Sequence, residues 1–421
     1  GNPIVPATGD KVQHVLDLRA YGAHALFWKR TYRSLYANNL ATALLPDVGM
    51  AAGWTHNHAA SLQPAGVSWV NGSQQTLLLP GGHVERFTYD ANSAKWQGLA
   101  ATRQLAASNG TWLYIDRESD QSHLFNAQGQ LQSTTDRNGW TTTYGYITVH
   151  GFARLGSVTN QFGRSLNIAY DDAGRLHTVS MAGVVQVSYQ YDGSGRLIKA
   201  TFADGSTETY LYQNTVYPYA LTGIADTYQQ PYAFFSYDAQ GRATQTERSG
   251  NTQRYQVSYP SSTGGLTTIT DPLGTTRSIT YSTKAGKLAV VGADKPDGIG
   301  QSDAFSRVQN ALGLIESETD FRGTSTTYSW DTIRRLPVLT TQAAGTSQQR
   351  TITTAWHPQW RLPAKVTEAG RETAYTYDSQ GNLLAPWLQR SSCPRGLIAC
   401  TAKVAGVARP APSALTARSQ P

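Results

Sequence analysis

The sequence predicts an all-β protein, an antiparallel array of β-hairpin repeats that forms part of a large spiralling sheet. Three observations carry this prediction. A seven-residue phrase recurs along the chain, the aromatic residues that begin its copies lie 21 to 26 residues apart, and a strict two-residue alternation leads into the clearest copies. A fixed period in this range indicates an array of one small supersecondary unit.

The phrase is Tyr-Asp-x-x-Gly-Arg-Leu. Clear copies begin at Tyr170, Tyr191, Tyr237 and Tyr377, weaker ones at Phe125, Tyr281, Trp330 and Trp356, and degenerate ones at Tyr146, Tyr212, Tyr259 and Phe305. Asp can bond the backbone that follows it and Gly can take a positive φ, so the phrase predicts a turn. The predicted turn residues are Asp171, Gly174, Arg175, Asp192, Gly195, Arg196, Asp238, Gly241, Arg242, Asp378 and Gly381.

The residues before each turn predict strands. Val185, Val187, Tyr189 and Tyr191 alternate with polar residues, which is typical of a half-buried strand. A second turn type, as at 204–206, 271–274 and 320–323, closes the other end of each unit. One period is therefore two strands of about six residues and two turns. We expect antiparallel strands throughout residues 70–384, little helix, and turns centred on Gly129, Gly174, Gly195, Gly241 and Gly381.

The repeated phrase resembles the YD repeats of the Rhs (rearrangement hot spot) family. The N-terminal stretch is similar too, although Gly9-Asp10-Lys11 stands where relatives usually have Gly-Asn-Lys. The resemblance covers roughly residues 1–384 and implies a hollow, cocoon-like β shell that encloses a C-terminal toxic domain. Asp271-Pro272-Leu273-Gly274 matches only the opening of the motif that precedes the toxin in relatives, so neither self-cleavage nor toxicity is carried over.

Four segments follow from these patterns. They are an Rhs-type N-terminal segment (1–70), a transitional β segment (71–120), the YD-repeat array (121–384) and an unstructured tail (385–421). In the tail the alternation, Tyr, Asp and Glu vanish together, and both cysteines, Cys393 and Cys400, lie there. The tail is read as a linker to a lost domain, a disulfide loop, an unstructured end or, as favoured here, out-of-frame translation of a truncated protein.

Composition limits the classes of partner. The net charge is +7, but five basic residues and no acidic ones lie in 385–421, which leaves +2 for the first 384 residues. No basic patch or stripe marks that body, so no nucleic-acid partner is predicted. No apolar run approaches the roughly 18 residues of a membrane span. Charged residues make up only 15%, which fits a secreted or envelope-associated bacterial protein whose leader was removed, or a fragment.

Candidate chemistry is sparse, and no catalytic, cofactor-binding or metal residue is predicted. His56 and His58 could face one side of a strand as metal ligands, but no further ligand lies near them in sequence, so a structural use is favoured. There is no Gly-x-Ser-x-Gly nucleophile turn and no phosphate-binding loop. The Tyr and Trp stripe is expected to pack within the sheet, although such rings could also stack on sugars.

The sequence therefore predicts a non-enzymatic structural shell or scaffold portion, whose relatives enclose a C-terminal toxin. The partner predicted for a full-length form is a toxin cargo. Self-association is expected at an open sheet edge near residues 372–377. The alternative is a surface-exposed carbohydrate-binding or adhesive β-repeat module with glycan partners. A toxin or glycosidase activity of the chain itself is disfavoured.

Overall fold

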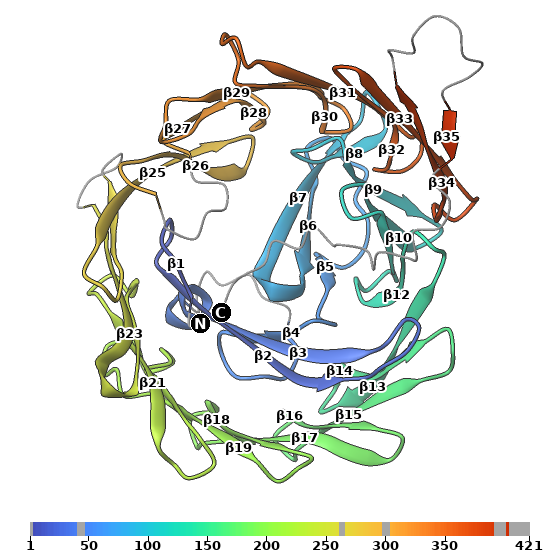
Figure 1. Cartoon of the computed structure of the whole chain (residues 1–421). Helices are drawn as coiled ribbons and strands as arrows, with labels where there is room; N and C mark the ends of the chain where they lie inside the picture. The colour runs from blue at the N-terminus through green and yellow to red at the C-terminus, as the bar shows by residue number, and fades with distance from the viewer. Residues whose placement is uncertain (1–2, 40–46, 261–265, 297–303, 391–400, 404–421) are drawn as a thin grey trace, which may run out of the picture.

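The computed structural model describes residues 3–39, 47–260, 266–296, 304–390 and 401–403, and its regular structure is almost entirely antiparallel β-sheet (Figure 1). The predicted all-β fold is confirmed. Within these residues, helix is confined to α1 (Ser34–Asn38) and the 3-10 turns η1 (Pro80–Gly82) and η2 (Ser249–Asn251). None of the helices in the described segments is long and apolar enough to cross a membrane.

The chain begins with a small sheet of four strands in the order β1-β2-β3-β4. They are β1 (Ile4–Val5), β2 (Asp10–Arg19), β3 (Phe27–Arg33) and β4 (Trp54–His56). This N-terminal sheet lies on the concave side of a much longer sheet, against strands β14 to β18 (Figure 1). Apolar residues of both sheets, among them Trp28, Tyr32, Trp54, Val179 and Val187, form one buried core, so the N-terminal sheet is part of the hydrophobic interior.

The longer sheet, called the wall below, contains all other strands. Its first part comprises β5 (Ser61–Gln63), β6 (Gln74–Leu79), β7 (His83–Asp90), β8 (Lys95–Gln97), β9 (Arg103–Ser108), β10 (Thr111–Asp116), β11 (Gln121–Phe125), β12 (Leu131–Thr135), β13 (Thr141–Val149), β14 (Phe152–Asn160), β15 (Ser165–Tyr170), β16 (Leu176–Met181), β17 (Val184–Tyr191), β18 (Leu197–Phe202), β19 (Thr207–Leu211), β20 (Gly223–Ala225), β21 (Pro231–Tyr237) and β22 (Ala243–Arg248). Its second part comprises β23 (Thr252–Ser258), β24 (Thr267–Thr270), β25 (Thr276–Lys284), β26 (Lys287–Ala293), β27 (Ser306–Gln309), β28 (Ile315–Thr319), β29 (Ser325–Asp331), β30 (Leu336–Gln342), β31 (Arg350–Trp356), β32 (Pro363–Glu368), β33 (Arg371–Tyr377), β34 (Leu383–Arg390) and β35 (Thr401–Lys403).

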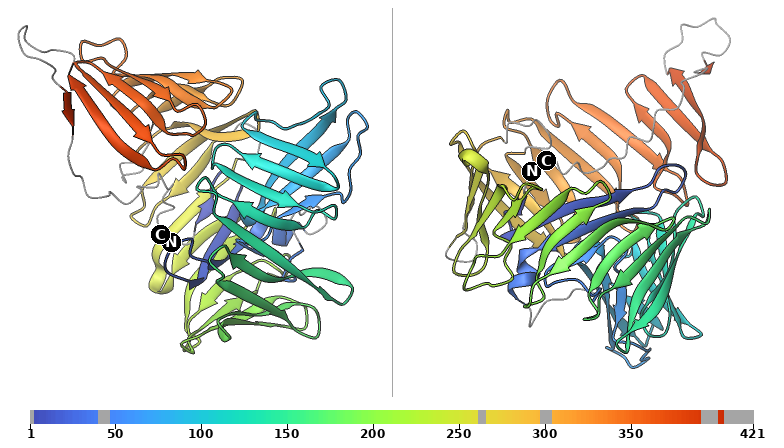
Figure 2. Two further views of the ribbon diagram at one scale, coloured as in Figure 1. Left: turned by 90° about the vertical axis from the view of Figure 1, so that its right-hand side faces the viewer. Right: turned by 90° about the horizontal axis from the view of Figure 1, so that it is seen from below.

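Each strand of the wall pairs with its neighbours in sequence, from β5 to β35. The first edge is covered by the wall itself: Ser61 forms an isolated bridge with Gln130, and the Leu62 N–H donates to the Gly129 carbonyl at 2.9 Å. This curl encloses a second apolar core that includes Leu62 and Trp112. From there the wall winds around the molecule, and its last strands lie at a different level from its middle ones, as in a spiral (Figure 2).

The repeated phrase folds into one recurring turn. In the copy that begins at Tyr191, Asp192 Oδ1 accepts the N–H groups of Ser194 and Arg196 at 3.0 and 2.9 Å, and Asp192 Oδ2 accepts Arg196 Nε at 2.6 Å. Gly195 has a φ of +77°, a conformation that glycine adopts without steric cost. The turns at Asp271 and Asp320, expected to be a second type, use the same backbone contacts to the Asp carboxylate.

The aromatic residue of each phrase ties its repeat to the one before. The Tyr191 hydroxyl donates to the Leu176 carbonyl at 2.7 Å, where Leu176 ends the preceding phrase. The same kind of contact, from a phenol or an indole N–H to a carbonyl fourteen to nineteen residues earlier, is made by Tyr170, Tyr237, Tyr259, Trp330, Trp356 and Tyr377. The phrase arginine lies over the next aromatic ring, as Arg175 does over Tyr191 at 4.9 Å.

These hydrogen bonds from one repeat to the one before it, called the ladder below, predict a measurable effect on stability. Tyr191→Phe should lower the free energy of unfolding by about 1 kcal/mol, because the Leu176 carbonyl loses its donor in a largely buried place. The control is Tyr255→Phe, at an exposed ring whose hydroxyl has no hydrogen-bond partner among the described residues, and it should leave stability nearly unchanged. Urea unfolding measures both, and an equal loss in the two variants would contradict the ladder.

Residues 372–377 do not form an open edge of the wall. Strand β33 (Arg371–Tyr377), expected to be that edge, is paired on both sides: Ala374 faces Lys365 of β32 and Trp387 of β34. Its backbone groups are therefore engaged within the sheet, and the prediction that residues 372–377 form the free edge is wrong.

The predicted start of the tail, at residue 385, also lies too early in the chain. Strand β34 continues to Arg390 beside β33, and β35 pairs with β34, so the prediction of an unstructured chain is wrong for residues 385–390 and 401–403. Pro386 is tolerated in β34 near the end of the sheet, where a missing donor costs least. The rest of the predicted tail, including Cys393 and Cys400, lies outside the described residues.

Candidate functional site

The predicted turn residues are not brought together in one pocket. Asp171, Asp192, Asp238 and Asp378 each sit in their own turn, and each carboxylate is occupied by its own backbone N–H groups. Backbone bonding holds the pKa of Asp171 and Asp192 below the ordinary value although burial opposes it. Arginine partners complete three of these turns, and Asn382 replaces the arginine at Asp378. These four carboxylates hold the backbone of their own turns, so none of the four is free to act as a general acid.

The N-terminal segment contacts three of the wall's turns. The Gly49 carbonyl accepts the Leu176 N–H at 2.8 Å, and the Gly9 carbonyl accepts the Ala243 N–H at 2.7 Å. Both donors directly follow the arginine of a repeated phrase. The Leu62 N–H binds Gly129 in the turn of the first phrase. These three hydrogen bonds, called the turn contacts, attach the N-terminal segment along the curve of the wall.

A fully buried ion pair lies where the N-terminal sheet meets the wall. The side chains of Arg30 and Asp17 have no exposed surface, and Arg30 Nη2 donates to Asp17 Oδ1 at 2.7 Å. The wall completes the site: the Tyr189 hydroxyl donates to Asp17 Oδ2 at 2.7 Å, and Arg30 Nη2 also donates to the Tyr210 hydroxyl at 3.0 Å. Although burial alone would lower it, the Asp17 carboxylate raises the pKa of Arg30 well above its ordinary value. The Arg30 guanidinium therefore stays charged in the interior.

Lys11 is a second buried cation of this interface. Its Nζ lies over the Phe235 ring of the wall, 4.3 Å from the centroid, and donates to the Val12 carbonyl and Gln13 Oε1. Burial lowers the pKa of Lys11 to about 7, although Asp10 opposes the shift. The neighbouring Asp10 is buried too and accepts Arg33 Nε at 2.5 Å.

The Lys11 shift predicts a pH dependence. Because the folded-state pKa is below the ordinary value, the unfolded chain binds more protons between about pH 7 and pH 10, so stability should rise with pH in that window. Lys11→Met should remove this rise, whereas Lys95→Met, at an exposed position, should keep it. Thermal unfolding at pH 7, 8 and 9 checks this, and parallel curves for wild type and Lys11→Met would contradict it.

The two histidines singled out from the sequence are packing residues. His56 stacks on Trp28 with ring centroids 4.3 Å apart, and His58 Nε2 binds the Phe27 carbonyl at 2.9 Å. Burial lowers the pKa of both, that of His58 to about 4, so both rings are neutral at pH 7. Within the described segments no group of three or more His, Cys, Asp or Glu side chains could hold a metal ion.

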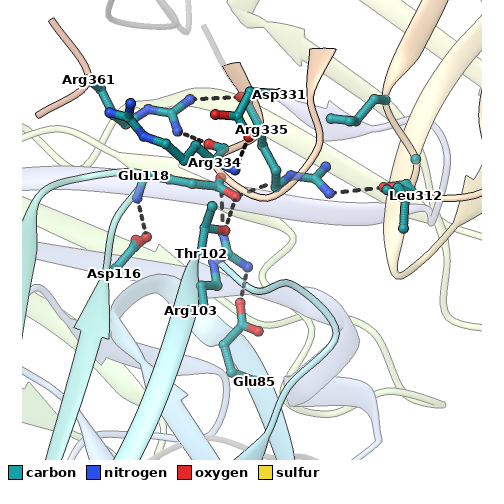
Figure 3. Close-up of polar contacts among 12 residues, drawn as sticks. Glu85, Thr102, Arg103, Asp116, Glu118, Leu312, Asp331, Arg334, Arg335 and Arg361 are labelled. Atoms are coloured by element: carbon teal, nitrogen blue, oxygen red, sulfur yellow. Dashed lines mark hydrogen bonds and ion pairs between the residues drawn. The ribbon is translucent and has the colours of Figure 1, made fainter. Parts of the chain in front are cut away.

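A polar contact joins the beginning of the wall to its end (Figure 3). Glu118, in the turn between β10 and β11, accepts Thr102 Oγ1 at 2.9 Å and lies 3.4 Å from Arg335 Nε, in the turn between β29 and β30. Arg103 lies 3.6 Å from the same carboxylate and also pairs with Glu85. We call this contact the seam, because it connects two windings of the spiral through side chains, without strand pairing among the described residues.

The basic side of the seam is held rigid by backbone carbonyls. Arg361 donates to the carbonyls of Arg334 and Arg335 at 2.7 and 3.1 Å, and Arg334 donates to those of His357 and Trp360. A cavity of about 740 Å³ lies within the seam, lined from the early side by residues such as Asp116 and from the late side by residues such as Arg361.

Neither the buried ion pair nor the seam was found from the sequence. One signal was present for the first: Arg30 alternates with Trp28 and Tyr32, so it occupies the inward face of a strand. A charge on an apolar face needs a buried partner. Glu118 and Arg335 offer no comparable signal, because a charged residue in a turn is ordinary. The aromatic stripe uses its polar atoms for contacts within the wall, and no observation favours a sugar site there.

Three family models match parts of the chain. A model described as a domain of unknown function (DUF6531) matches residues 1–79, an RHS Repeat model matches 125–151, and a Teneurin YD-shell model matches 156–245. No curated protein sequence matches the chain.

Among solved structures, one titled TcdB2-TccC3-TEV shares 12% identity over 91% of this chain and 22% of its own, with a TM-score of 0.34. The Tc holotoxin pore of Photorhabdus luminescens shares 10% identity over 90% and 24%, with a TM-score of 0.38. The chain thus spans under a quarter of the length of these two proteins.

Proposed function

We propose that this chain, an Rhs/YD-repeat protein, serves as a non-catalytic part of the wall of a shell that holds a polypeptide on its concave side. Its family relationship is the premise, since the repeat region matches the RHS Repeat and Teneurin YD-shell models and the N-terminal segment matches the DUF6531 model. By the Rhs resemblance the enclosed polypeptide is a toxin, and the wall is a secreted or envelope-associated component.

One observation carries the proposal: a single sheet winds around the molecule until its β29–β30 turn meets its β10–β11 turn at the seam (Figure 1). An open sheet of this length is expected to curl, because curling removes exposed edges and buries one face. The concave face of β14 to β22 is covered by the N-terminal sheet, and β1 lies on that side. A guest attached to the N-terminus would therefore start on the concave side.

The test is protection of a guest. A short protease-sensitive reporter peptide is attached before residue 1, ahead of β1, and in a matched variant inserted beside Leu273, a hairpin-tip residue that is 92% exposed. A bulky protease should cut the N-terminal reporter several-fold more slowly, because the wall limits its approach. Equal cleavage rates at the two sites would contradict an enclosing role.

A further inference from the structure

The second half of the wall is attached to the first differently from the rest of the molecule. The two apolar cores draw only on residues up to Phe235 and up to Leu131, respectively. No described residue of β27 to β34, called the flap below (residues 306–390), belongs to either core. The flap is therefore tied to the start of the wall through the polar seam rather than through a shared hydrophobic interior.

The seam is electrostatically complementary and incompletely packed. Its early side is a turn that carries Asp116, Glu118 and Asp120 together with Arg117, and its late side presents Arg335 and Arg361. The 740 Å³ cavity lies between the two sides, so they do not close-pack. Polar contacts of this kind resemble interfaces between domains that move.

The sheet also has a weak joint at the base of the flap. Among the described residues, strands β26 and β27 share one register pair, Gly292 with Ser306; beside it the Ala293 N–H donates to the Phe305 carbonyl at 3.2 Å and Arg307 Nη1 donates to the Val290 carbonyl at 3.3 Å. The other single-position pairing, Trp96 with Leu105 between β8 and β9, is secured by two side chains buried in an apolar core. A strand pair that has few backbone hydrogen bonds and no apolar core behind it is a place where local opening costs little free energy.

We propose that the seam is an ionic latch: the Glu118–Arg335 contact holds the flap against the start of the wall, and its loss lets the flap swing about the β26–β27 joint and open the shell. This inference rests on the proposed shell function and adds its regulation. Opening separates the β10–β11 turn from the β29–β30 turn and bends the sheet at the β26–β27 joint, while the strand pairings within the flap and within the earlier part of the wall persist. The latch should respond to salt, because at 1 M ionic strength the screening length falls to about 3 Å.

The experiment measures a distance across the seam. Gln121→Cys and Gln359→Cys, both exposed and lining the seam cavity from opposite sides, carry spin labels in the full chain with Cys393→Ser and Cys400→Ser. Wild type at low salt should give a short, narrow distance distribution. Glu118→Arg should raise the ratio of long to short distances roughly tenfold. Adding Arg335→Glu to Glu118→Arg should restore the short distance in part, because the pair is rebuilt with reversed charges while Arg103 still faces the new cation at position 118.

The control is Glu316→Arg, which makes the same charge change at an exposed strand position of the flap and should leave the distances unchanged. If Glu118→Arg and 1 M salt both leave the short distance intact, the latch is wrong while the shell stands. If wild type gives long distances in every condition, the wall does not return to itself and the shell proposal fails as well.

Discussion

Replacing Arg30 with methionine is expected to lower the free energy of unfolding by about 3–5 kcal/mol, which is the usual cost of leaving one member of a buried ion pair without its partner. Asp17 would then be left without its cationic partner in an interior where neither side chain of the pair has exposed surface. The Tyr189 hydroxyl would remain its main donor. Because Arg30 also binds Tyr210 of the wall, the N-terminal sheet should loosen from the wall before the wall itself unfolds.

Two further variants separate the buried charge from lost packing. Arg30→Met combined with Asp17→Leu should recover part of the loss, since an apolar pair can replace a buried ionic one. Arg350→Met removes an exposed ion pair with Glu368, whose side chains are 52% and 24% exposed, and should cost less than about 1 kcal/mol. Denaturant unfolding measures all three. A loss for Arg30→Met no larger than that for Arg350→Met would show that the buried pair contributes little.

Gly129→Ala is expected to destabilise the protein by about 3–4 kcal/mol, whereas Gly195→Ala should cost only about 1 kcal/mol. Both glycines occupy the same position of the repeated turn, with φ of +76° and +77°. A methyl group at Gly195 meets nothing within 4 Å, so only the backbone conformation is strained. At Gly129 it would overlap the Leu62 carbonyl, which belongs to the strand that covers the first edge of the wall.

Comparing the two variants separates the contribution of the contact with Leu62 from the conformational strain within the turn. Thermal unfolding of the two variants, with Ser194→Ala as a neighbour that has an ordinary φ, gives the three values needed. Similar losses at Gly129 and Gly195 would mean that the contact between Leu62 and the first repeated turn does not hold the edge of the wall.

The features of the fold that were predicted well from the sequence are the repeated ones. The period, the turn glycines and the two-residue alternation are local features, so each copy of the phrase specifies its own hairpin without reference to the rest of the chain. The alternation fails where tertiary context decides: Val185, assigned to the same face as Val187, is 48% exposed because it lies at the hairpin tip beside a bulge, whereas Val187 is fully buried.

The contacts that curve and close the wall could not be read from such local patterns. Gly9 and Gly49 bind turns more than a hundred residues away, and Glu118 meets Arg335 only after one winding of the sheet. The free edge was misplaced at residues 372–377 because loss of the repeated phrase was taken as loss of the strand. Leu383–Arg390 pairs through its backbone, which requires no repeat motif.

Small-angle X-ray scattering of the full chain in solution tests the central claim most directly. A compact globule of 421 residues has a radius of gyration of about 22 Å. The account predicts a clearly larger value and a distance distribution with its maximum shifted toward long distances, as mass arranged in a curved wall around open space requires. A radius near 22 Å with a symmetric, bell-shaped distribution would show a solid, close-packed protein and would contradict the wall.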